Sequence, residues 1–468
     1  MSVISPSNRY QQEIFSSLDD QVDQDSIVRI IDKVVDVISK EEAIAKALEI
    51  KAGRPEYPKQ AILKLYIYGY MNRVKSSRKL ERECKLNIEV MWLMGKLQPD
   101  HWTISKFRKD NTEEIKSTIK SFNKFLIESH YIEGKTIVID GTKLKANASS
   151  SGNMNIEGIS ERLEDIENKI VSYLESFNQN DEFDQEKEKI SELRKEKEEL
   201  EKQVNQLRKQ NKKVYVKTDP DSNIIRTKEG TRAAYNAQIS CDQKHKLIIA
   251  TDVSSQSNDF KQLGNMYQNS KEMLLGKKPE EVIADAGYYS PETIQKIEED
   301  EQVNTFVAEL PEQTKGEFKY NKQEDAYTCS QGKRLKFEKQ KLNTRGRQTR
   351  VYRCNECSGC PIKNQCTTSG KGRIKIRYIN QDFRDSYREK MKQEKSKQKI
   401  RLRKAIVEHP IGTIKLWLGK NPLLLRGIEK VKTEIRLVSL SYNLLRIYNI
   451  DGFNRLMSKL NNYALQPT

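Results

Sequence analysis

The chain has 468 residues, of which 32% are charged, and its mean hydropathy is −0.81. This length suffices for two or three domains, and no apolar run approaches the roughly 20 residues that cross a membrane. The first residues lack the charged and apolar regions of a signal peptide, so we expect a cytoplasmic protein. A net charge of +17 favours a polyanionic partner, most simply nucleic acid, although a basic surface also serves solubility alone.

The first 130 residues carry the periodicity of helices. Apolar side chains recur at helical spacing over 26–38 and from Pro58 to Met71, and Ser77 is placed to cap a following basic helix. Pro99 marks another helix start. A short helix, a turn and a basic helix are typical of a helix-turn-helix-like DNA reader, but a plain helical bundle with a charged face fits equally well. We predict a helical DNA-binding domain over residues 1–130, with the DNA-contacting side chains Arg78, Lys79, Arg82 and Arg108.

Two short apolar strands are each predicted to end on an aspartate. Thr136 to Ile139 is followed by Asp140 and a turn at Gly141, and Glu281 to Ala284 is followed by Asp285. A carboxylate at the end of a buried strand is held rigidly and still reaches solvent, as a metal ligand must. Aspartate and glycine also form turns without any chemistry, so one such acid is a weak signal and two are a stronger one.

Further segments complete a predicted sheet. The alternation over 234–242 and the apolar run over 247–253 indicate a β-hairpin, a helix follows near 260–275, and Thr305 to Leu310 forms a last strand. This order of elements predicts a mixed five-stranded α/β sheet within a catalytic domain that spans residues 131–455.

Residues 157–212 interrupt that domain with a different pattern. Apolar residues recur three to four positions apart over 163–177 and 190–207, with Glu and Lys between them, and 178–185 separates the two runs as a turn. The pattern predicts a coiled-coil helical insertion. Such an insertion serves dimerisation or DNA contact, or is a stalk without chemistry of its own.

Five of the seven cysteines lie close together near the middle of the C-terminal half. Disulfides are rare in the cytosol, and the Cys-x2-Cys spacing suits a tetrahedral zinc site, with thiol exchange as the alternative. We predict a structural Zn²⁺ in a cysteine-rich insertion over 312–370. Four of the following five residues would bind the ion: Cys329, Cys354, Cys357, Cys360 and Cys366.

Glu408 follows a densely basic stretch, residues 371–404, and supplies a third acid. Together with Asp140 and Asp285 it is suited to a three-carboxylate site, because Mg²⁺ and Mn²⁺ prefer oxygen ligands. Two such ions about 4 Å apart activate a water or a 3′-hydroxyl and stabilise the leaving oxygen of a phosphodiester. The pattern therefore favours metal-dependent chemistry on nucleic acid.

The segments around the three acids, IVIDGTKLKANAS, VIADAGYYS and VEHPIGTIK, resemble the motifs of the DDE transposases of bacterial insertion sequences. The chain resembles the branch with an N-terminal helical domain and a cysteine-rich insert, from about Tyr57 to Asn449. The resemblance implies a ribonuclease-H-like catalytic domain in which the three acids hold two metal ions. It also implies that the partners are terminal inverted repeats and target DNA, and that the protein is a homodimer in the synaptic complex.

The resemblance implies that Lys415 binds phosphate at the end of the element. The family usually has Tyr and Arg where this chain has Arg401 and Lys404. Lys404 keeps the positive charge without the bidentate fork of arginine, and Arg401 lacks the aromatic ring. Pro410 is expected to bend the helix just beyond Glu408.

Three functions fit these observations. The favoured one is a DNA transposase that binds its inverted repeats and catalyses metal-dependent cleavage and strand transfer. The alternatives are a ribonuclease-H-like nuclease that cuts without joining, and a catalytically inactive, domesticated DNA-binding protein. The three intact acids argue against the last. We expect the protein to be cytoplasmic, associated with the nucleoid and without a membrane part.

Overall fold

The computed structural model describes residues 17–46, 56–149, 153–176, 183–210, 212–227, 229–309, 318–342 and 348–465. The chain divides into two compact units: unit 1 comprises Met1–Pro279 and Ala405–Thr468, and unit 2 comprises Glu280–Lys404. Among the described residues, no helix combines the length and the apolar character needed to span a membrane.

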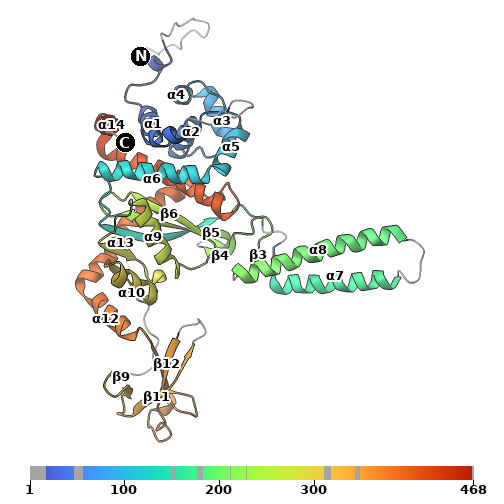
Figure 1. Ribbon diagram of the computed structural model, residues 1–468, viewed down its shortest axis with the longest axis vertical. Helices are drawn as coiled ribbons and strands as arrows, with labels where there is room; N and C mark the ends of the chain where they lie inside the picture. Colours follow the sequence, from blue (N-terminus) through green and yellow to red (C-terminus); the bar gives the residue numbers. More distant parts are fainter. Residues whose placement is uncertain are drawn as a thin grey trace, which may run out of the picture. The chain divides into compact units, whose positions relative to one another are not determined.

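The N-terminal part of unit 1 is helical, as predicted (Figure 1). After the 3₁₀ turn η1 (Asp19–Gln21) come α1 (Ile27–Lys46), α2 (Lys59–Met71), α3 (Ser77–Leu86), α4 (Ile88–Leu93), α5 (His101–Asp110) and α6 (Thr112–Glu128). α5 begins after Asp100, whose carboxylate accepts a hydrogen bond of 2.7 Å from the backbone N–H of Thr103. Ser77 is the first residue of α3; the capping position belongs to Ser76, whose side chain makes no capping bond, so that prediction was wrong.

The last helix, α14 (Ile428–Ala464), packs against α1, α2, α5 and α6 and against strand β6 (Ile248–Ser254). It is 37 residues long. At Gly452 the backbone leaves the helical region, with φ of 70° and ψ of 178°, a conformation that favours glycine. The helices at the start of the chain therefore share a core with its C-terminal end. The boundary of the helical domain at residue 130 stays a prediction.

The sheet of unit 1 is antiparallel and centred on a long strand, β5 (Gly230–Asp242). It pairs with β1 (Thr136–Lys145), β6 and β4 (Asn223–Thr227), and the helix α9 (Gln262–Met273) packs against β5 and β6. The predicted hairpin and helix are confirmed. β4 was not predicted, because its five residues alternate too weakly between apolar and polar to stand out in the sequence.

β1 does not end at Asp140. It continues to Lys145, Gly141 is paired opposite Gln238 of β5, and the expected turn is absent from this described strand. The reason lies in the alternation beyond the acid: Thr142 and Leu144 are buried while Lys145 is exposed, which is the pattern of a half-buried strand. Asp140 therefore lies within a strand, and the residues directly before and after it are both paired with β5.

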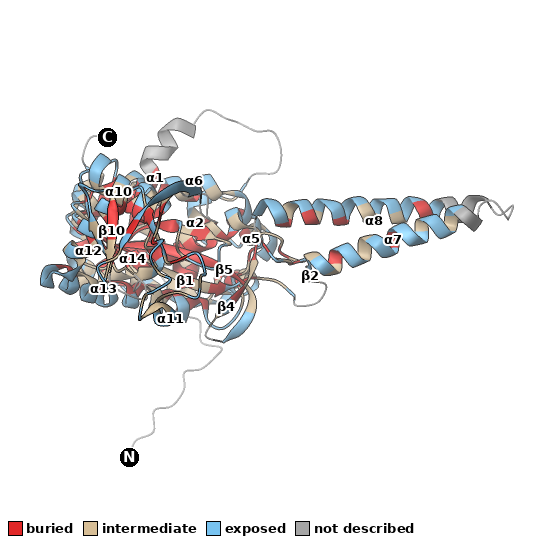
Figure 2. Ribbon diagram, turned by 90° about the horizontal axis from the view of Figure 1, so that it is seen from below, coloured by how far each residue is buried: buried red, intermediate tan, exposed pale blue. Residues whose placement is uncertain are grey.

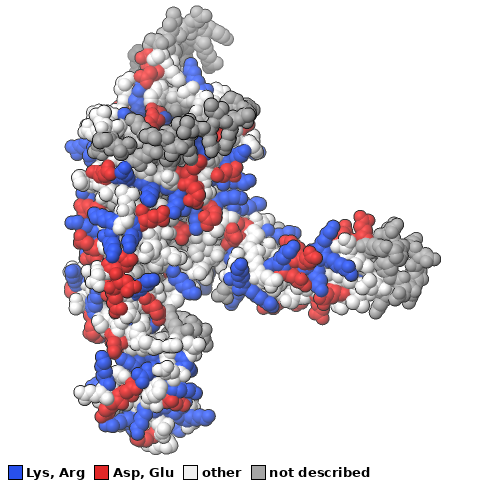
Figure 3. Space-filling model, in the orientation of Figure 1, with Lys and Arg blue, Asp and Glu red and all other residues white. Residues whose placement is uncertain are grey.

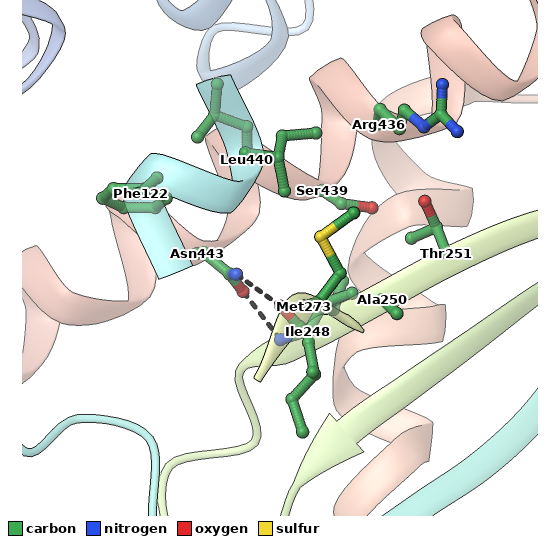
Figure 4. Close-up of a pocket in the computed structure, with 11 residues that line it drawn as sticks. Phe122, Ile248, Ala250, Thr251, Met273, Arg436, Ser439, Leu440 and Asn443 are labelled. Atoms are coloured by element: carbon green, nitrogen blue, oxygen red, sulfur yellow. Dashed lines mark hydrogen bonds between the residues drawn. The ribbon is translucent and has the colours of Figure 1, made fainter. Parts of the chain in front are cut away.

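Asn443 fastens α14 to the sheet of unit 1 (Figure 4). Its side-chain oxygen accepts a hydrogen bond of 2.8 Å from the backbone N–H of Ile248, and its nitrogen donates one of 2.7 Å to the carbonyl of the same residue. A small cavity of about 20 Å³ lies beside this contact, lined mainly by apolar side chains such as Phe122, Met273 and Leu440. The cavity is too small to hold a ligand of substantial size.

Two long helices occupy the segment predicted as an insertion: α7 (Ile156–Ser176) and α8 (Phe183–Gln210), with the short strands β2 (Met154–Asn155) and β3 (Val214–Tyr215) at their base. They pack through a core cluster that includes Ile166, Leu200 and Leu207, while most of their length is exposed (Figure 2). Lys197 forms an ion pair of 2.7 Å with Glu167. Phe177 and most of the predicted turn lie outside the described residues. The coiled-coil insertion stays a prediction.

Unit 2 contains two sets of strands. The first is the parallel pair β7 (Glu281–Ala284) and β8 (Asn304–Val307), with η2 (Ala286–Tyr288) and α10 (Pro291–Asp300) between them. The second is an antiparallel sheet in the order β13 (Ile374–Tyr378), β12 (Gln348–Arg353), β11 (Arg334–Leu342), β10 (Ala326–Cys329) and β9 (Phe318–Asn321), with the short α11 (Lys363–Cys366) after β12. Antiparallel and parallel pairs together confirm the mixed α/β class.

Two helices follow the sheet, α12 (Gln381–Lys392) and α13 (Glu394–Leu418). Pro410 lies within α13, and the helix continues through it to Leu418. The loss of one backbone donor at Pro410 is thus tolerated inside a helix of 25 residues. Glu408 and Lys415 consequently belong to one helix.

Candidate active site

Asp140 is held on a rigid strand and remains partly accessible to solvent. The preceding residues of β1, Ile137 to Ile139, are fully buried, and Asp140 itself is half-buried opposite Ile239 of β5. One carboxylate oxygen accepts a hydrogen bond of 2.8 Å from the backbone N–H of Gly141. Burial, followed by the nearby charge of Asp140, raises the pKa of the Cys241 thiol well above its usual value. Asp140 has the position of a fixed acidic ligand.

Glu408 and Lys415 are both exposed on α13. Seven residues make close to two turns of an α-helix, so the two side chains lie on the same face, about 10 Å apart along the axis. His409, between them, is occupied elsewhere: its Nδ1 lies 2.9 Å from the hydroxyl of Tyr442 on α14. The helix therefore presents one acidic and one basic side chain, Glu408 and Lys415, on the same face.

A cavity of about 710 Å³ in unit 1 lies beside both Lys415 and the residue that follows Asp140. Gly141, the residue after Asp140, and Lys415 both line it. The fold thus places Gly141, which follows Asp140, and Lys415, the predicted phosphate-binding residue, around the same cavity. More than 270 residues separate the two in the sequence.

Asp285 directly follows β7 in unit 2, as predicted. Its carboxylate accepts a hydrogen bond of 2.8 Å from the backbone N–H of Gly287 and caps η2. Tyr288 is buried, and the hydroxyl of Tyr289 lies 3.1 Å from Glu309, so both neighbouring rings are engaged in packing within unit 2. Asp285 is the partly exposed polar group of this turn.

The chemistry of the three acids suits Mg²⁺ or Mn²⁺, which take carboxylate oxygens as ligands. Asp140 and Glu408 belong to unit 1 and Asp285 belongs to unit 2. In the part of the chain that is described, no three His, Cys, Asp or Glu side chains form a group that would hold a metal ion.

The basic residues predicted to contact DNA divide into exposed and buried ones. Arg78, Lys79 and Arg82 are exposed on α3, which packs against α5. Lys404 and Arg401 are exposed on α13, the latter 3.4 Å from Glu394. On the face seen in Figure 3, lysine and arginine are interspersed with acidic residues and do not form one continuous patch.

Arg108 is buried, with 3% of its surface exposed. Its guanidinium donates to the hydroxyl of Tyr70 at 3.3 Å and to the carbonyl of Lys75 at 3.4 Å, and it lies over the ring of Tyr66. These contacts occupy Arg108 inside the helical core. We therefore assign it a packing role and remove it from the DNA-contacting set.

The basic stretch over 371–404 is largely paired with acids inside unit 2. Arg388 binds Glu309 at 2.7 Å and Lys390 binds Glu298 at 2.6 Å, and Arg384 binds Glu292 at 3.1 Å. The acids come from α10 and the end of β8, about 80 to 90 residues away in the sequence. Sequence reasoning could not foresee these pairs, and they leave much of this stretch neutralised.

The five clustered cysteines line one small cavity of about 20 Å³ in unit 2. Cys354 packs in the core of the second sheet with Tyr327, Leu335 and Tyr352, and burial raises the pKa of its thiol to about 11. The sulfur of Cys357 accepts a hydrogen bond of 3.4 Å from the backbone N–H of Arg373. All five thiols thus line the same cavity, but among the described residues no three of them form a group arranged to hold a metal ion, and the zinc site stays a prediction.

Two segments of the chain match family models of known proteins. Residues 16–110 match the family described as a transposase domain (DUF772), and residues 328–448 match the family described as a transposase DDE domain. The first match covers η1 and α1 to α5, and the second contains the cysteines, Glu408 and Lys415. Both matched families are transposase families, as the motifs predicted.

Other comparisons are weaker. No curated protein matches the chain. A cryo-EM structure of the piggyBac transposase synaptic complex with hairpin DNA is similar over 93% of this chain and 77% of that chain, with 9% sequence identity and a TM-score of 0.30. A score this low does not establish a common fold.

Proposed function

We propose that this protein is a DNA transposase that binds the terminal inverted repeats of its element and catalyses metal-dependent cleavage and strand transfer. The observation that carries the proposal is the cavity shared by Gly141, next to Asp140, and Lys415 on α13. The two transposase family matches, one at each end of the chain, support the same function. The catalytic domain would be ribonuclease-H-like.

Asp140, Asp285 and Glu408 are the proposed ligands of two Mg²⁺ or Mn²⁺ ions. When bound, such ions supply an activated water or 3′-hydroxyl and stabilise the departing oxygen of the phosphodiester. The pairing of β1 with β5 holds Asp140 in place, the capped turn holds Asp285, and α13 carries Glu408. Lys415, on the same helical face as Glu408, binds a phosphate of the DNA end and so orients the scissile bond.

The remaining predicted residues receive supporting roles. Arg401 and Lys404, exposed on α13, bind DNA phosphates without the stacking or the bidentate contact that Tyr and Arg would provide. Arg78, Lys79 and Arg82 on α3 contact the inverted repeat. Four of the five clustered cysteines bind a structural Zn²⁺, which the gathering of the thiols around one cavity supports. The active species is a homodimer that holds two DNA ends.

Cleavage of the protein's own flanking DNA tests this function. Purified protein is incubated with labelled duplex carrying the DNA that flanks its gene, with Mg²⁺ and then with EDTA. We expect nicking at the element boundary only with the metal. Asp140→Asn should lower the cleavage rate by about 1,000-fold or more because it removes a metal ligand, while binding stays within about twofold. Asp300→Asn, on the exposed end of α10, is the matched control.

Each other outcome points to a different function. Specific binding without any cleavage would identify a catalytically inactive DNA-binding protein. Cleavage without sequence preference would identify a nuclease. If Asp140→Asn abolished binding as well as cleavage, the acid would be structural and its assignment as a metal ligand would fall.

A further inference from the structure

The cavity next to Asp140 carries a charge pattern that Lys415 alone does not explain. Its volume of about 710 Å³ lies within the ~300–1,000 Å³ typical of ligand sites. One acidic residue, Glu229, lines it. The basic residues that line it are Lys143, Lys145, Arg226, Arg232, Lys415 and Lys420.

These basic side chains come from four different elements of unit 1 and from the segment that follows α13. Lys143 and Lys145 follow Asp140 on β1, Arg226 and Arg232 lie on β4 and β5, and the other two lie on α13 and just beyond it. Contacts between elements that are distant in sequence therefore assemble the basic wall. A random scatter of surface lysines would not converge on one concave site.

Half of the basic residues have no acid to neutralise them. Lys143 lies 3.3 Å from Asp259, and Arg232 lies 2.8 Å from Glu229. Across the described ranges, Lys145, Arg226 and Lys420 have no carboxylate within ion-pair distance, and all three are exposed. The cavity thus keeps an excess of positive charge available to a ligand.

Hydrogen bonds fix the wall that carries Lys420. The backbone N–H of Leu423 donates to the carbonyl of Lys145 at 2.9 Å. The fully buried carboxylate of Glu434 accepts from the backbone N–H groups of Leu424 and Leu425, at 2.9 and 3.1 Å. The segment after α13 is therefore anchored to β1 and α14 before any ligand arrives, which lowers the entropic cost of binding.

The lining indicates what part of a nucleic acid this site contacts. None of the lining residues is aromatic, so the site offers no surface on which a base would stack. Arginine and lysine are suited to phosphate oxygens, arginine through two parallel hydrogen bonds. Contacts of this kind hold the sugar-phosphate backbone and carry no sequence information.

We propose that this cavity binds the phosphodiester backbone of a DNA strand that runs onward from Asp140, through Lys145, Arg226 and Lys420. The inference rests on the proposed transposase function and adds a strand-holding site to it. The site determines the path of the strand beyond the scissile phosphate, and it binds DNA of any sequence.

Salt-dependent DNA binding tests the site in the full-length protein. The double variant Lys145→Gln, Lys420→Gln is compared with the double variant Lys120→Gln, Lys430→Gln, which removes the same charge from exposed positions on α6 and α14 outside the cavity. Binding of a labelled duplex carrying the flanking DNA, and of a scrambled duplex, is measured in EDTA at several salt concentrations. A third variant, Lys145→Arg, Lys420→Arg, controls for folding.

We expect the cavity variant to lose about two units of the salt slope and to raise Kd roughly tenfold, because two phosphate contacts are lost. The loss should be the same for both duplexes, and the arginine variant should restore binding. Equal losses in the cavity and control variants would overturn the site. A loss of binding that affects only the duplex with the flanking sequence would also overturn the site. So would a finding that poly-glutamate competes for the wild-type protein as strongly as unlabelled DNA does.

Wild-type cleavage with Mg²⁺ is measured in parallel. If the wild type does not cleave DNA and only the cavity variant loses DNA binding, the result contradicts the transposase function and supports the strand-binding site. If the wild type cleaves DNA and the cavity and control glutamine variants bind DNA equally well, the result supports the transposase function and contradicts the strand-binding site.

Discussion

At the scale of single residues, burial decides the role of polar side chains more than their type does. Arg108 and Arg82 both lie on predicted DNA-facing helices, yet Arg108 is buried against Tyr66 and Tyr70 and Arg82 is exposed. Asn443 is a similar case: it is 3% exposed and bonds both backbone groups of Ile248. Such residues hold the fold in place and take no direct part in chemistry.

Replacing Asn443 with alanine tests this role. The change leaves a buried N–H and a buried carbonyl without partners, so we expect the free energy of unfolding to fall by about 2–4 kcal/mol. Urea unfolding, followed by circular dichroism, measures the loss. Asn72→Ala is the control, since Asn72 is exposed and bonds only within its own helix end; it should cost less than about 0.5 kcal/mol. Equal losses in the two variants would contradict the argument.

At the scale of elements, one acid ties α14, directly before its kink at Gly452, to the segment before β1. Burial alone would raise the pKa of Asp451, but hydrogen bonds from Lys459 and Tyr131 outweigh it and hold the pKa below its ordinary value. Because the folded state then binds fewer protons than the unfolded state, this contact stabilises the protein above a pH of about 4 and is lost as pH falls through the lowered pKa.

Asp451→Asn tests the contact. We expect the variant to be less stable than the wild type by about 2 kcal/mol at pH 7, the loss of a charged hydrogen bond. The difference should shrink as the pH falls below about 4, where the wild-type carboxylate takes up a proton. Thermal unfolding across this pH range gives the two curves. A difference that is independent of pH would contradict the role of the charge.

The cysteine cluster is a second element-scale test. If four thiols bind a structural zinc, the purified protein should contain about one zinc per chain, and Cys354→Ser should lose it and destabilise the second sheet of unit 2. Metal content by mass spectrometry, for serine variants of all five cysteines, should show loss in four of them. Cys84→Ala, a buried thiol on α3, should keep its zinc. Zinc absent from the wild type would favour a thiol-exchange role.

At the scale of the whole molecule, the proposed function requires the three acids to act together in cleavage. Removing any one of Asp140, Asp285 and Glu408 should therefore abolish cleavage, and the double variant Asp140→Asn, Asp285→Asn should be no slower than either single variant. Residual rates of cleavage at the DNA end provide the measurement. Losses that multiply in the double variant would show that the acids act independently and would contradict a shared metal site.

Local sequence patterns determined much of what is now described. The apolar periodicity of 26–38 and 58–71 predicted α1 and α2, the apolar run before Asp285 predicted β7, and the close spacing of the cysteines agrees with their lining one cavity. These features depend on which face of an element is buried, and that information is carried by residues a few positions apart. The motifs around the acids likewise pointed to the transposase families that match both ends of the chain.

Other features were decided only by tertiary structure. β1 continues past Asp140 because β5 pairs with it, and Arg108 is buried because it packs against Tyr66 and Tyr70 of α2. The basic stretch over 371–404 meets acids from α10 and from the residues after β8. The basic cavity likewise collects residues from β1, β4, β5 and α13. Whether a charged side chain faces water, an acid or a ligand depends on contacts between residues far apart in the chain, and no local pattern records those contacts.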